Sequence, residues 1–207
     1  MKTLARLVLL VVLVSSSLHA NGVGIMDAHN AVYLRLDSAV VNVSVESQIS
    51  VTTTTQYFTN THPTDTVKYG FPLPEQASAT QLRWRVNGQW FTASVAGTSQ
   101  DTTLPGGGTP HPNLVSYLGR TPLYFGIPQL VRADSTLAVE LTYVELLPYA
   151  FGNVNYVYPS DYHLIQTGSI EFQKLWFQLT SPRTIDSIRV LSNHPVQQLI
   201  NTGNNAS

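Results

Sequence analysis

Apolar and polar residues alternate along most of this chain with a period of two, which is the spacing of a β-strand. Between residues 39 and 57 the odd positions are mostly apolar, and every even position except Val40 is polar. This run is longer than an ordinary strand. It predicts two strands that meet near Glu46-Ser47-Gln48, with the odd-numbered residues facing a core and the even-numbered ones facing water.

The same alternation recurs along the rest of the chain. Asn87-Gly88 separates two such runs, and both residues tolerate the positive φ of a tight hairpin turn. Trp84 and Val86 share one phase, whereas Arg83 and Arg85 point the other way. No segment shows a helical apolar stripe, so the pattern predicts an all-β fold, an antiparallel β-sandwich of about ten short strands. Further strands are expected at residues 33–36, 66–71, 80–86, 89–95, 123–131, 136–147, 154–158, 169–179 and 185–190.

A rigid corner follows the strand at residues 66–71. Its sequence is Phe71-Pro72-Leu73-Pro74-Glu75, and the two prolines fix φ and remove two backbone donors. The chain must therefore leave the strand in an extended conformation. Phe71 and Leu73 then lie on one side of the corner and are expected to anchor it to the core, while Glu75 is expected to cap the turn.

The ends of the chain and one internal loop differ from the strands. Lys2, Arg6 and the apolar run that follows them are typical of a secretory signal peptide at residues 1–20, expected to form a helix. An uncleaved anchor is the alternative, but the apolar run is shorter than the ~20 residues that span a bilayer. One domain is expected at residues 21–196, with a flexible Gly/Pro-rich loop at 97–113 and a tail at 197–207.

Composition narrows the possible partners. Only 11% of the 207 residues are charged, and there is no cysteine, so lipidation at the signal junction and thiolate metal sites are excluded. Removal of Lys2 and Arg6 with the signal peptide would take the formal net charge from −1 to −3. That balance is too mild for a nucleic-acid partner. No segment after residue 20 could span a membrane, and an exported protein in the periplasm, at the cell surface or outside the cell is expected.

Candidate catalytic and metal-binding residues are few. The six histidines show no metal-like spacing, and no cofactor is predicted. Asp161 and His163 could form half of a catalytic triad, but no serine lies in a Gly-x-Ser-x-Gly turn. A secreted hydrolase therefore remains only a minor alternative, and the sequence favours a protein without enzymatic activity.

Aromatic residues near Gly152 and Asn155 offer a different possibility. Such residues in a loop can bind sugars or proteins by stacking and apolar contact. A carbohydrate-binding module is therefore the second hypothesis, with the alternative that about half of these side chains face the core. The possible aromatic surface consists of Tyr149, Phe151, Tyr156, Tyr158 and Tyr162.

The order of these motifs resembles the VIT domain, the vault protein inter-alpha-trypsin domain. A strand with valines at 41, 43 and 45 precedes a Gln-x-Phe-x-Asn run, and the Phe-Pro-Leu-Pro-Glu corner follows. Weaker matches continue to about residue 196. The residues that carry the motif are Gln56, Phe58, Asn60, Tyr69, Phe71, Pro72, Leu73, Pro74 and Glu75.

The resemblance implies a β-sandwich without catalytic residues that mediates protein interaction, adhesion or scaffolding, as in proteins similar to the inter-alpha-trypsin inhibitor heavy chains. It implies a protein partner, or a component of the extracellular matrix or cell surface. In this family the domain usually precedes a von Willebrand type A domain, which is a possible partner if the chain is a fragment. The chain departs from the family pattern after the hairpin, where an uncharged Gly/Pro loop replaces a charged, often helical stretch.

Overall fold

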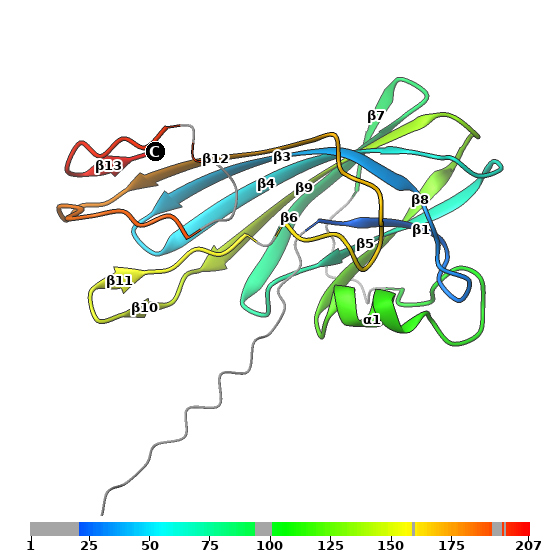
Figure 1. The fold of residues 1–207 in the computed structure, drawn as a ribbon, viewed down its shortest axis with the longest axis horizontal. Helices are drawn as coiled ribbons and strands as arrows, with labels where there is room; N and C mark the ends of the chain where they lie inside the picture. Colours follow the sequence, from blue (N-terminus) through cyan, green and yellow to red (C-terminus); the bar gives the residue numbers. More distant parts are fainter. Residues whose placement is uncertain (1–20, 94–100, 159, 192–195, 197) are drawn as a thin grey trace, which may run out of the picture.

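Two β-sheets face one another in the computed structural model of the chain (Figure 1), which describes residues 21–93, 101–158, 160–191, 196 and 198–207. The larger sheet has seven strands in the order β13-β12-β3-β4-β9-β6-β7. The all-β fold predicted from the alternation is therefore confirmed. The strands of this sheet are β3 (Arg35–Glu46), β4 (Ile49–Thr59), β6 (Ala77–Val86), β7 (Gln89–Thr92), β9 (Thr136–Leu146), β12 (Phe172–Thr180) and β13 (Asn205–Ala206).

The smaller sheet has four strands in the order β2-β1-β5-β8 and covers part of one face of the larger sheet. Helix α1 (Pro112–Leu118) lies beside it and buries Leu114, Tyr117 and Leu118. A separate hairpin, β10 (Tyr149–Ala150) with β11 (Asn153–Val154), extends from the end of β9. The strands of the smaller sheet are β1 (Val23–Asp27), β2 (Val32–Tyr33), β5 (Asp65–Pro72) and β8 (Pro122–Val131).

The core has two parts. The larger part lies between the sheets and includes Ile25, Tyr69 and Phe71 from the smaller sheet and Phe58 and Leu141 from the larger one. A second cluster buries Val41, Val43 and Val45 of β3 with Leu147, and Tyr156 and Tyr158 pack against it. The smaller sheet thus packs on one part of the inner face, and residues of the segment from 147 to 158 pack on another part.

Strand β4 has the opposite phase from the prediction. The two-residue turn Ser47-Gln48 pairs Glu46 with Ile49, so the inward positions change from odd numbers in β3 to even numbers in β4. Ser50, Thr52 and Thr54 are fully buried, and Val51 is exposed. The polar residues are accommodated because Thr52 and Thr54 hydrogen-bond the hydroxyls of two tyrosines, at 3.1 and 3.3 Å.

Several other details of the sandwich differ from the prediction. Strand β12 pairs with β3 in parallel, so the larger sheet is not purely antiparallel. The main strands are longer than expected, as β3 has 12 residues. Residues 185–190, predicted as a last strand, contain none, and the strand predicted at 154–158 is reduced to β11. The short helix α1 was not predicted, because it shows less than two turns of any pattern.

The Asn-Gly hairpin prediction is confirmed. Asn87 and Gly88 have φ of 51° and 80°, and they join β6 to β7 with Val86 opposite Gln89. Both residues lie in the left-handed region that a type I′ turn requires. Trp84 and Val86 are buried, while Arg83 and Arg85 lie on the other side of the sheet.

The described part of the predicted Gly/Pro-rich loop, from residue 101, makes hydrogen bonds to the rest of the protein. Ala28 donates its N–H to Pro105 and accepts a hydrogen bond from the His111 N–H. Gly106 has φ of 92°, and a Cβ there would lie 2.0 Å from the Asp27 carboxylate. Only glycine therefore allows this close approach. Residues 94–100 lie outside the described residues, as does the predicted signal segment 1–20.

The ammonium of Lys68 ties the same loop to β5. Lys68 is 6% exposed, and its Nζ contacts Asp101 Oδ2 at 2.8 Å and the carbonyl oxygen of Thr103. The hydrogen bond from Lys68 lowers the pKa of Asp101 from its usual 3.8 to about 2, with help from the Thr103 N–H. The loop is therefore attached by an ionic contact as well as by backbone hydrogen bonds.

We expect this contact to make stability depend on acidic pH. Because the pKa of Asp101 is depressed in the folded state, its contribution is present above about pH 4 and is lost as the pH falls towards 2. Thermal melts of the wild type and Asp101→Asn should differ at pH 6 and converge at pH 2. The same difference between the two proteins at both pH values would contradict the assignment.

Candidate interaction surface

The Gln-x-Phe-x-Asn residues of the predicted motif all face the interior. Gln56, Phe58 and Asn60 lie at alternate positions of β4 and just beyond it, and none is exposed. Asn60 donates from Nδ2 to the carbonyl oxygens of Val131 and Pro63 and accepts from the His62 N–H through Oδ1. The motif asparagine thus joins the end of β4 to the end of β8.

Gln56 is the centre of a buried hydrogen-bond network around the start of the described chain. Its Oε1 accepts from the Gly22 N–H at 3.1 Å and from the Tyr69 hydroxyl at 2.6 Å, and its Nε2 donates to Asn21 Oδ1 at 3.1 Å. Burial raises the pKa of Tyr69 well above its usual 10.0, so the hydroxyl remains a donor. The network has a structural role, because it fixes Asn21 and Gly22 to β4 and β5.

The Phe-Pro-Leu-Pro-Glu corner is also part of the architecture. Phe71 is completely buried, and its ring lies 6.3 Å from that of Tyr69 and 5.8 Å from that of Tyr143, between centroids. Leu73 is partly buried against the same core. Glu75 is exposed and lies 3.4 Å from Arg120, so it forms a surface contact between the end of β5 and the start of β8.

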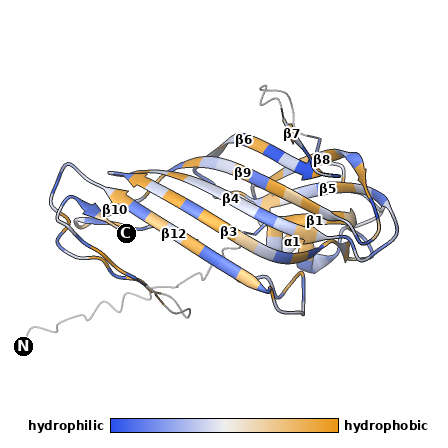
Figure 2. Ribbon diagram, turned by 90° about the horizontal axis from the view of Figure 1, so that it is seen from above, coloured by the Kyte–Doolittle hydropathy of each residue, from blue (hydrophilic) through white to orange (hydrophobic). Residues whose placement is uncertain are grey.

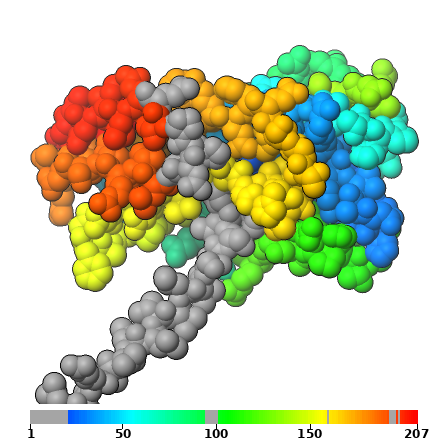
Figure 3. All heavy atoms as spheres, in the orientation of Figure 1, coloured from blue at the N-terminus to red at the C-terminus, as the bar shows by residue number. Residues whose placement is uncertain are grey.

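The five aromatic residues proposed as one surface are separated in the structure. Tyr149 and Phe151 are exposed on the β10–β11 hairpin, which projects at one end of the molecule in yellow (Figure 3). Tyr162 is buried and donates to the Gly22 carbonyl oxygen at 3.1 Å. Tyr156 and Tyr158 direct their hydroxyls to the buried threonines of β4. Of the five, Tyr149 and Phe151 are the exposed residues, whereas Tyr156 and Tyr158 are partly buried.

Asp161 and His163 do contact one another, with 2.5 Å between Oδ1 and Nδ1. Both side chains are exposed, and no hydroxyl side chain of the described residues hydrogen-bonds this imidazole. Among the described residues the pair therefore has no hydroxyl positioned as the nucleophile of a triad. Within the described residues, no three His, Asp or Glu side chains gather in a way that could hold a metal ion.

The side of the larger sheet that faces away from the smaller sheet, here called the outer face, is not covered by any other described element (Figure 2). Figure 2 looks down on it, and no other described element crosses β3, β4 or β9. The colours of the figure show apolar and polar residues mixed across these strands rather than a polar surface alone. The outer face is therefore a broad, open sheet surface.

Large apolar side chains are exposed on this face from one edge to the other. Tyr57 is 41% exposed, Trp90 43% and Trp176 55%. Their strands are β4, β7 and β12, so the three residues span the sheet. Ile49, Val51, Leu146 and Phe172 are further exposed residues on the same face.

Charged side chains lie among these aromatics. Arg83 makes two hydrogen bonds to the Glu140 carboxylate, at 2.6 and 3.0 Å, which raise its pKa. The guanidinium of Arg83 also lies 4.7 Å from the centre of the Trp90 ring, and Lys174 lies 3.9 Å from that of Trp176. The guanidinium of Arg85 makes no hydrogen bond or ion pair with any part of the chain that the structure describes.

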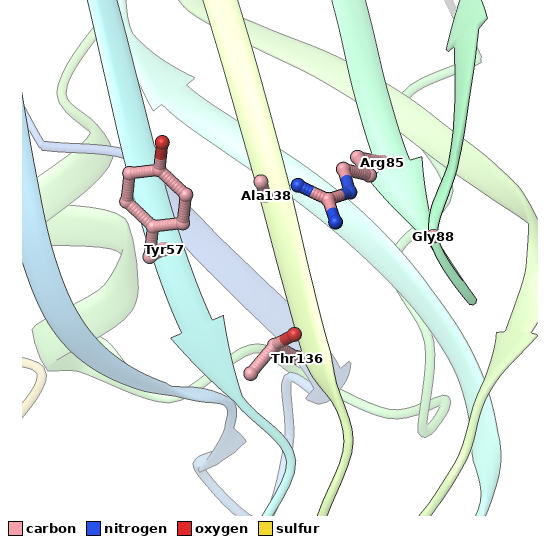
Figure 4. Close-up of a pocket in the computed structure, with 5 residues that line it drawn as sticks. All are labelled: Tyr57, Arg85, Gly88, Thr136 and Ala138. Atoms are coloured by element: carbon pink, nitrogen blue, oxygen red, sulfur yellow. The ribbon is translucent and has the colours of Figure 1, made fainter.

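A shallow depression of about 120 Å³ lies beside Arg85 (Figure 4). Strand pairing places Arg85 and Tyr57 on opposite sides of Ala138, one in β6 and one in β4. Because Ala138 has the smallest of the three side chains, a hollow remains above it. The guanidinium of Arg85 extends from β6 towards Ala138, and Tyr57 lies on the far side of the Ala138 strand (Figure 4). Thr136 and Gly88 complete the lining.

Sequence reasoning found part of this surface. It placed Arg83 and Arg85 on the face opposite Trp84, which is where they lie. It placed Tyr57 with the core residues, because it assumed that β4 keeps the phase of β3. A two-residue turn at Ser47-Gln48 places Glu46 opposite Ile49. Because opposite residues of a hairpin share a face, recognising this turn would have given the correct phase of β4.

The comparison with protein families finds a match over about a third of the chain. The model of the Vault protein inter-alpha-trypsin domain matches residues 36–102, which include β3 to β7, the Phe-Pro-Leu-Pro-Glu corner and Arg85. No curated protein matches this chain in a sequence comparison. No helix among the described residues is both long and apolar enough to cross a membrane. Residues 36–102 thus match the Vault protein inter-alpha-trypsin (VIT) domain, the family that the order of motifs resembles.

Proposed function

We propose that this chain is an exported, non-enzymatic module that binds another protein through the outer face of its larger sheet. The VIT domain is a non-catalytic protein-interaction domain. The observation that carries the choice of surface is that no other described element covers the outer face (Figure 2), while Tyr57, Trp90 and Trp176 are exposed on it. The match to the VIT domain supports interaction in general, and the surface is our assignment.

The residue types on the outer face favour a protein partner. Tyr, Trp and Arg are the side chains that most often dominate the energy of protein interfaces. The aromatic residues are spread over the sheet from β7 to β12 rather than gathered in one pocket, which suits a broad contact. A small ligand would use a deeper site than the depression beside Arg85.

Export and adhesion are further parts of the proposal. VIT-domain proteins are typically extracellular, and the predicted signal at residues 1–20 supports secretion. The partner is then a protein of the cell surface or the extracellular matrix. A von Willebrand type A domain is one candidate, because the family resemblance implies it as a neighbour.

Sugar binding is the second candidate function, and the β10–β11 hairpin is the observation that favours it. Phe151 is fully exposed, at 102%, and Tyr149 on the same hairpin is 54% exposed. Exposed aromatic rings can stack on sugars. This surface holds two of the five predicted aromatics, so it is smaller than the sequence suggested.

Photo-crosslinking from single positions distinguishes the two surfaces. A photoreactive phenylalanine replaces Tyr57 or Trp176 on the outer face, or Phe151 on the hairpin as the control. The protein is irradiated with the cell-surface and extracellular proteins of its source organism. We expect one discrete product from the two outer-face positions, and none from position 151.

Competition shows whether the product is specific. Unlabelled wild-type protein should abolish the crosslink, and an unlabelled Tyr57→Ala, Trp90→Ala double variant should compete at least about tenfold less well, which corresponds to ~1.4 kcal/mol. A discrete product from position 151 alone, or equal competition by the double variant, would refute the assignment to the outer face.

A further inference from the structure

Resting on the function proposed above, we infer that the outer face recognises an acidic segment of its protein partner, and that Arg85 receives a carboxylate of that segment. The inference begins with the charges of neighbouring arginines. Arg83 is neutralised by Glu140, which also accepts from Thr55 Oγ1 at 3.4 Å. Arg85, two residues further along β6, has no such partner among the described residues. One positive charge of this pair is thus available.

The surroundings of Arg85 match a carboxylate. The depression is about 120 Å³, which is large enough for the end of an Asp or Glu side chain, and it is open to solvent on the outer side. The guanidinium is a planar fork of N–H donors that binds a carboxylate through two parallel hydrogen bonds. Tyr57 and Thr136 line the same depression, and each carries a hydroxyl that could donate a further hydrogen bond to a bound carboxylate.

Other ionisable groups near the depression do not neutralise the positive charge of Arg85. Glu140, on the same face of β9, is committed to Arg83. Arg132 and Asp134 lie in the turn before Thr136 and carry opposite charges. The local balance around the depression is therefore positive, and charge complementarity selects an acidic partner.

The aromatic residues on either side of Arg85 and Ala138 favour a protein segment over a free acid as the ligand. Trp90 lies directly opposite Arg85 in β7, and Tyr57 lies on the other side of Ala138. Both rings are about four-tenths exposed. An extended acidic segment lying across these strands would place one carboxylate at Arg85 and apolar parts of its neighbours on the two rings. A free carboxylate would contact Arg85 but neither of the two rings.

Titration of the ¹⁵N-labelled chain with three peptides tests the inference. The probes are an acetylated Thr-Glu-Thr-Glu-Thr amide, the same peptide with Gln for Glu, and a version with phosphoserine for Glu. We expect the Glu peptide to shift the Arg85 Nε–H signal and the Thr136 and Ala138 amide signals in a saturable way. The Gln peptide should bind at least about tenfold more weakly.

Arg85→Gln should weaken binding of the Glu peptide by about tenfold or more. Tyr57→Phe, which removes only a hydroxyl, should weaken it by about threefold. Arg189→Gln is the matched control, since it makes the same charge change on an exposed residue that follows β12 and is not part of the depression. Equal effects of the two Arg→Gln variants, equal binding of the Glu and Gln peptides, or tighter binding of the phosphoserine peptide would each overturn the inference.

The crosslinking experiment separates this inference from the function on which it rests. If the outer face crosslinks a partner and Arg85→Gln does not weaken the Glu peptide, the surface stands and the acidic segment is refuted. If the partner crosslinks only to position 151, the outer face itself is refuted.

Discussion

Phe71→Ala should lower the free energy of unfolding by about 3–5 kcal/mol, the range measured for large-to-small replacements of buried aromatic residues. Phe71 is not exposed at all, and its ring contacts Tyr69 and Tyr143 between the two sheets. Truncation leaves a cavity that the neighbouring prolines, with their fixed φ, cannot easily close. Urea denaturation followed by intrinsic fluorescence measures the change.

Phe151→Ala is the matched control for this variant. It removes the same atoms from a side chain that is fully exposed on the β10–β11 hairpin, so we expect a change within about 0.5 kcal/mol. A loss below about 1 kcal/mol for Phe71→Ala would show that the Phe-Pro-Leu-Pro-Glu corner is not anchored in the core.

Gln56→Leu should cost about 3 kcal/mol, although it keeps the approximate size of the side chain. The change leaves the Gly22 N–H and the Tyr69 hydroxyl without an acceptor in the core, and each orphaned group costs about 1–3 kcal/mol. Asn21 Oδ1 retains a hydrogen bond from Tyr158 at 3.3 Å. Gln178→Leu, on an exposed part of β12, is the control and should change stability by less than about 0.5 kcal/mol.

A double-mutant cycle shows whether the hydrogen bond to Tyr69 causes this loss. In a Tyr69→Phe background the hydroxyl is absent, so Gln56→Leu should cost at least about 1 kcal/mol less than in the wild type. Strict additivity of the two substitutions would contradict the network around Gln56 as the source of the stability.

Local signals predicted much of the fold. The Asn87-Gly88 turn, the strand at residues 136–146 and the rigid corner after Phe71 depend on nearby residues, and each is where the sequence indicated. Turn residues and strand alternation report backbone conformation within a few positions. The VIT match over residues 36–102 agrees with this order of motifs.

The phase of β4 could not be read from hydrophobicity. Val51 is more apolar than Ser50 or Thr52, yet Val51 faces out and the two polar residues are buried. The burial is stable only because partners from far along the chain satisfy the polar atoms, as Tyr156 does for Thr52. A single strand carries no information about such partners.

Strand β1 and the parallel pairing of β12 depend on contacts between distant parts of the chain. Gly22 and Gly24 weaken any strand pattern, but they are needed because a Cβ at either position would clash with Tyr69 or Leu34. Strand β12 pairs with β3 across more than 130 residues of sequence. Neither arrangement leaves a local signature.

The part of the candidate site that depends on a single strand was predictable, and the part that depends on contacts between strands was not. The alternation in β6 placed Arg83 and Arg85 on the outer face. The depression beside Arg85 exists because the registers of β6, β9 and β4 bring Ala138 between two long side chains. Register across three strands is a property of the folded sheet.

Hydroxyl-radical footprinting of the complex with the crosslinked partner tests most directly that the outer face is the binding surface. Oxidation is quantified at each aromatic residue by mass spectrometry, with and without the partner. We predict that Tyr57, Trp90 and Trp176 become protected, while Tyr149 and Phe151 on the hairpin remain as reactive as in the free protein. Protection of Tyr149 and Phe151 with unchanged reactivity of Tyr57 and Trp90 would contradict the account.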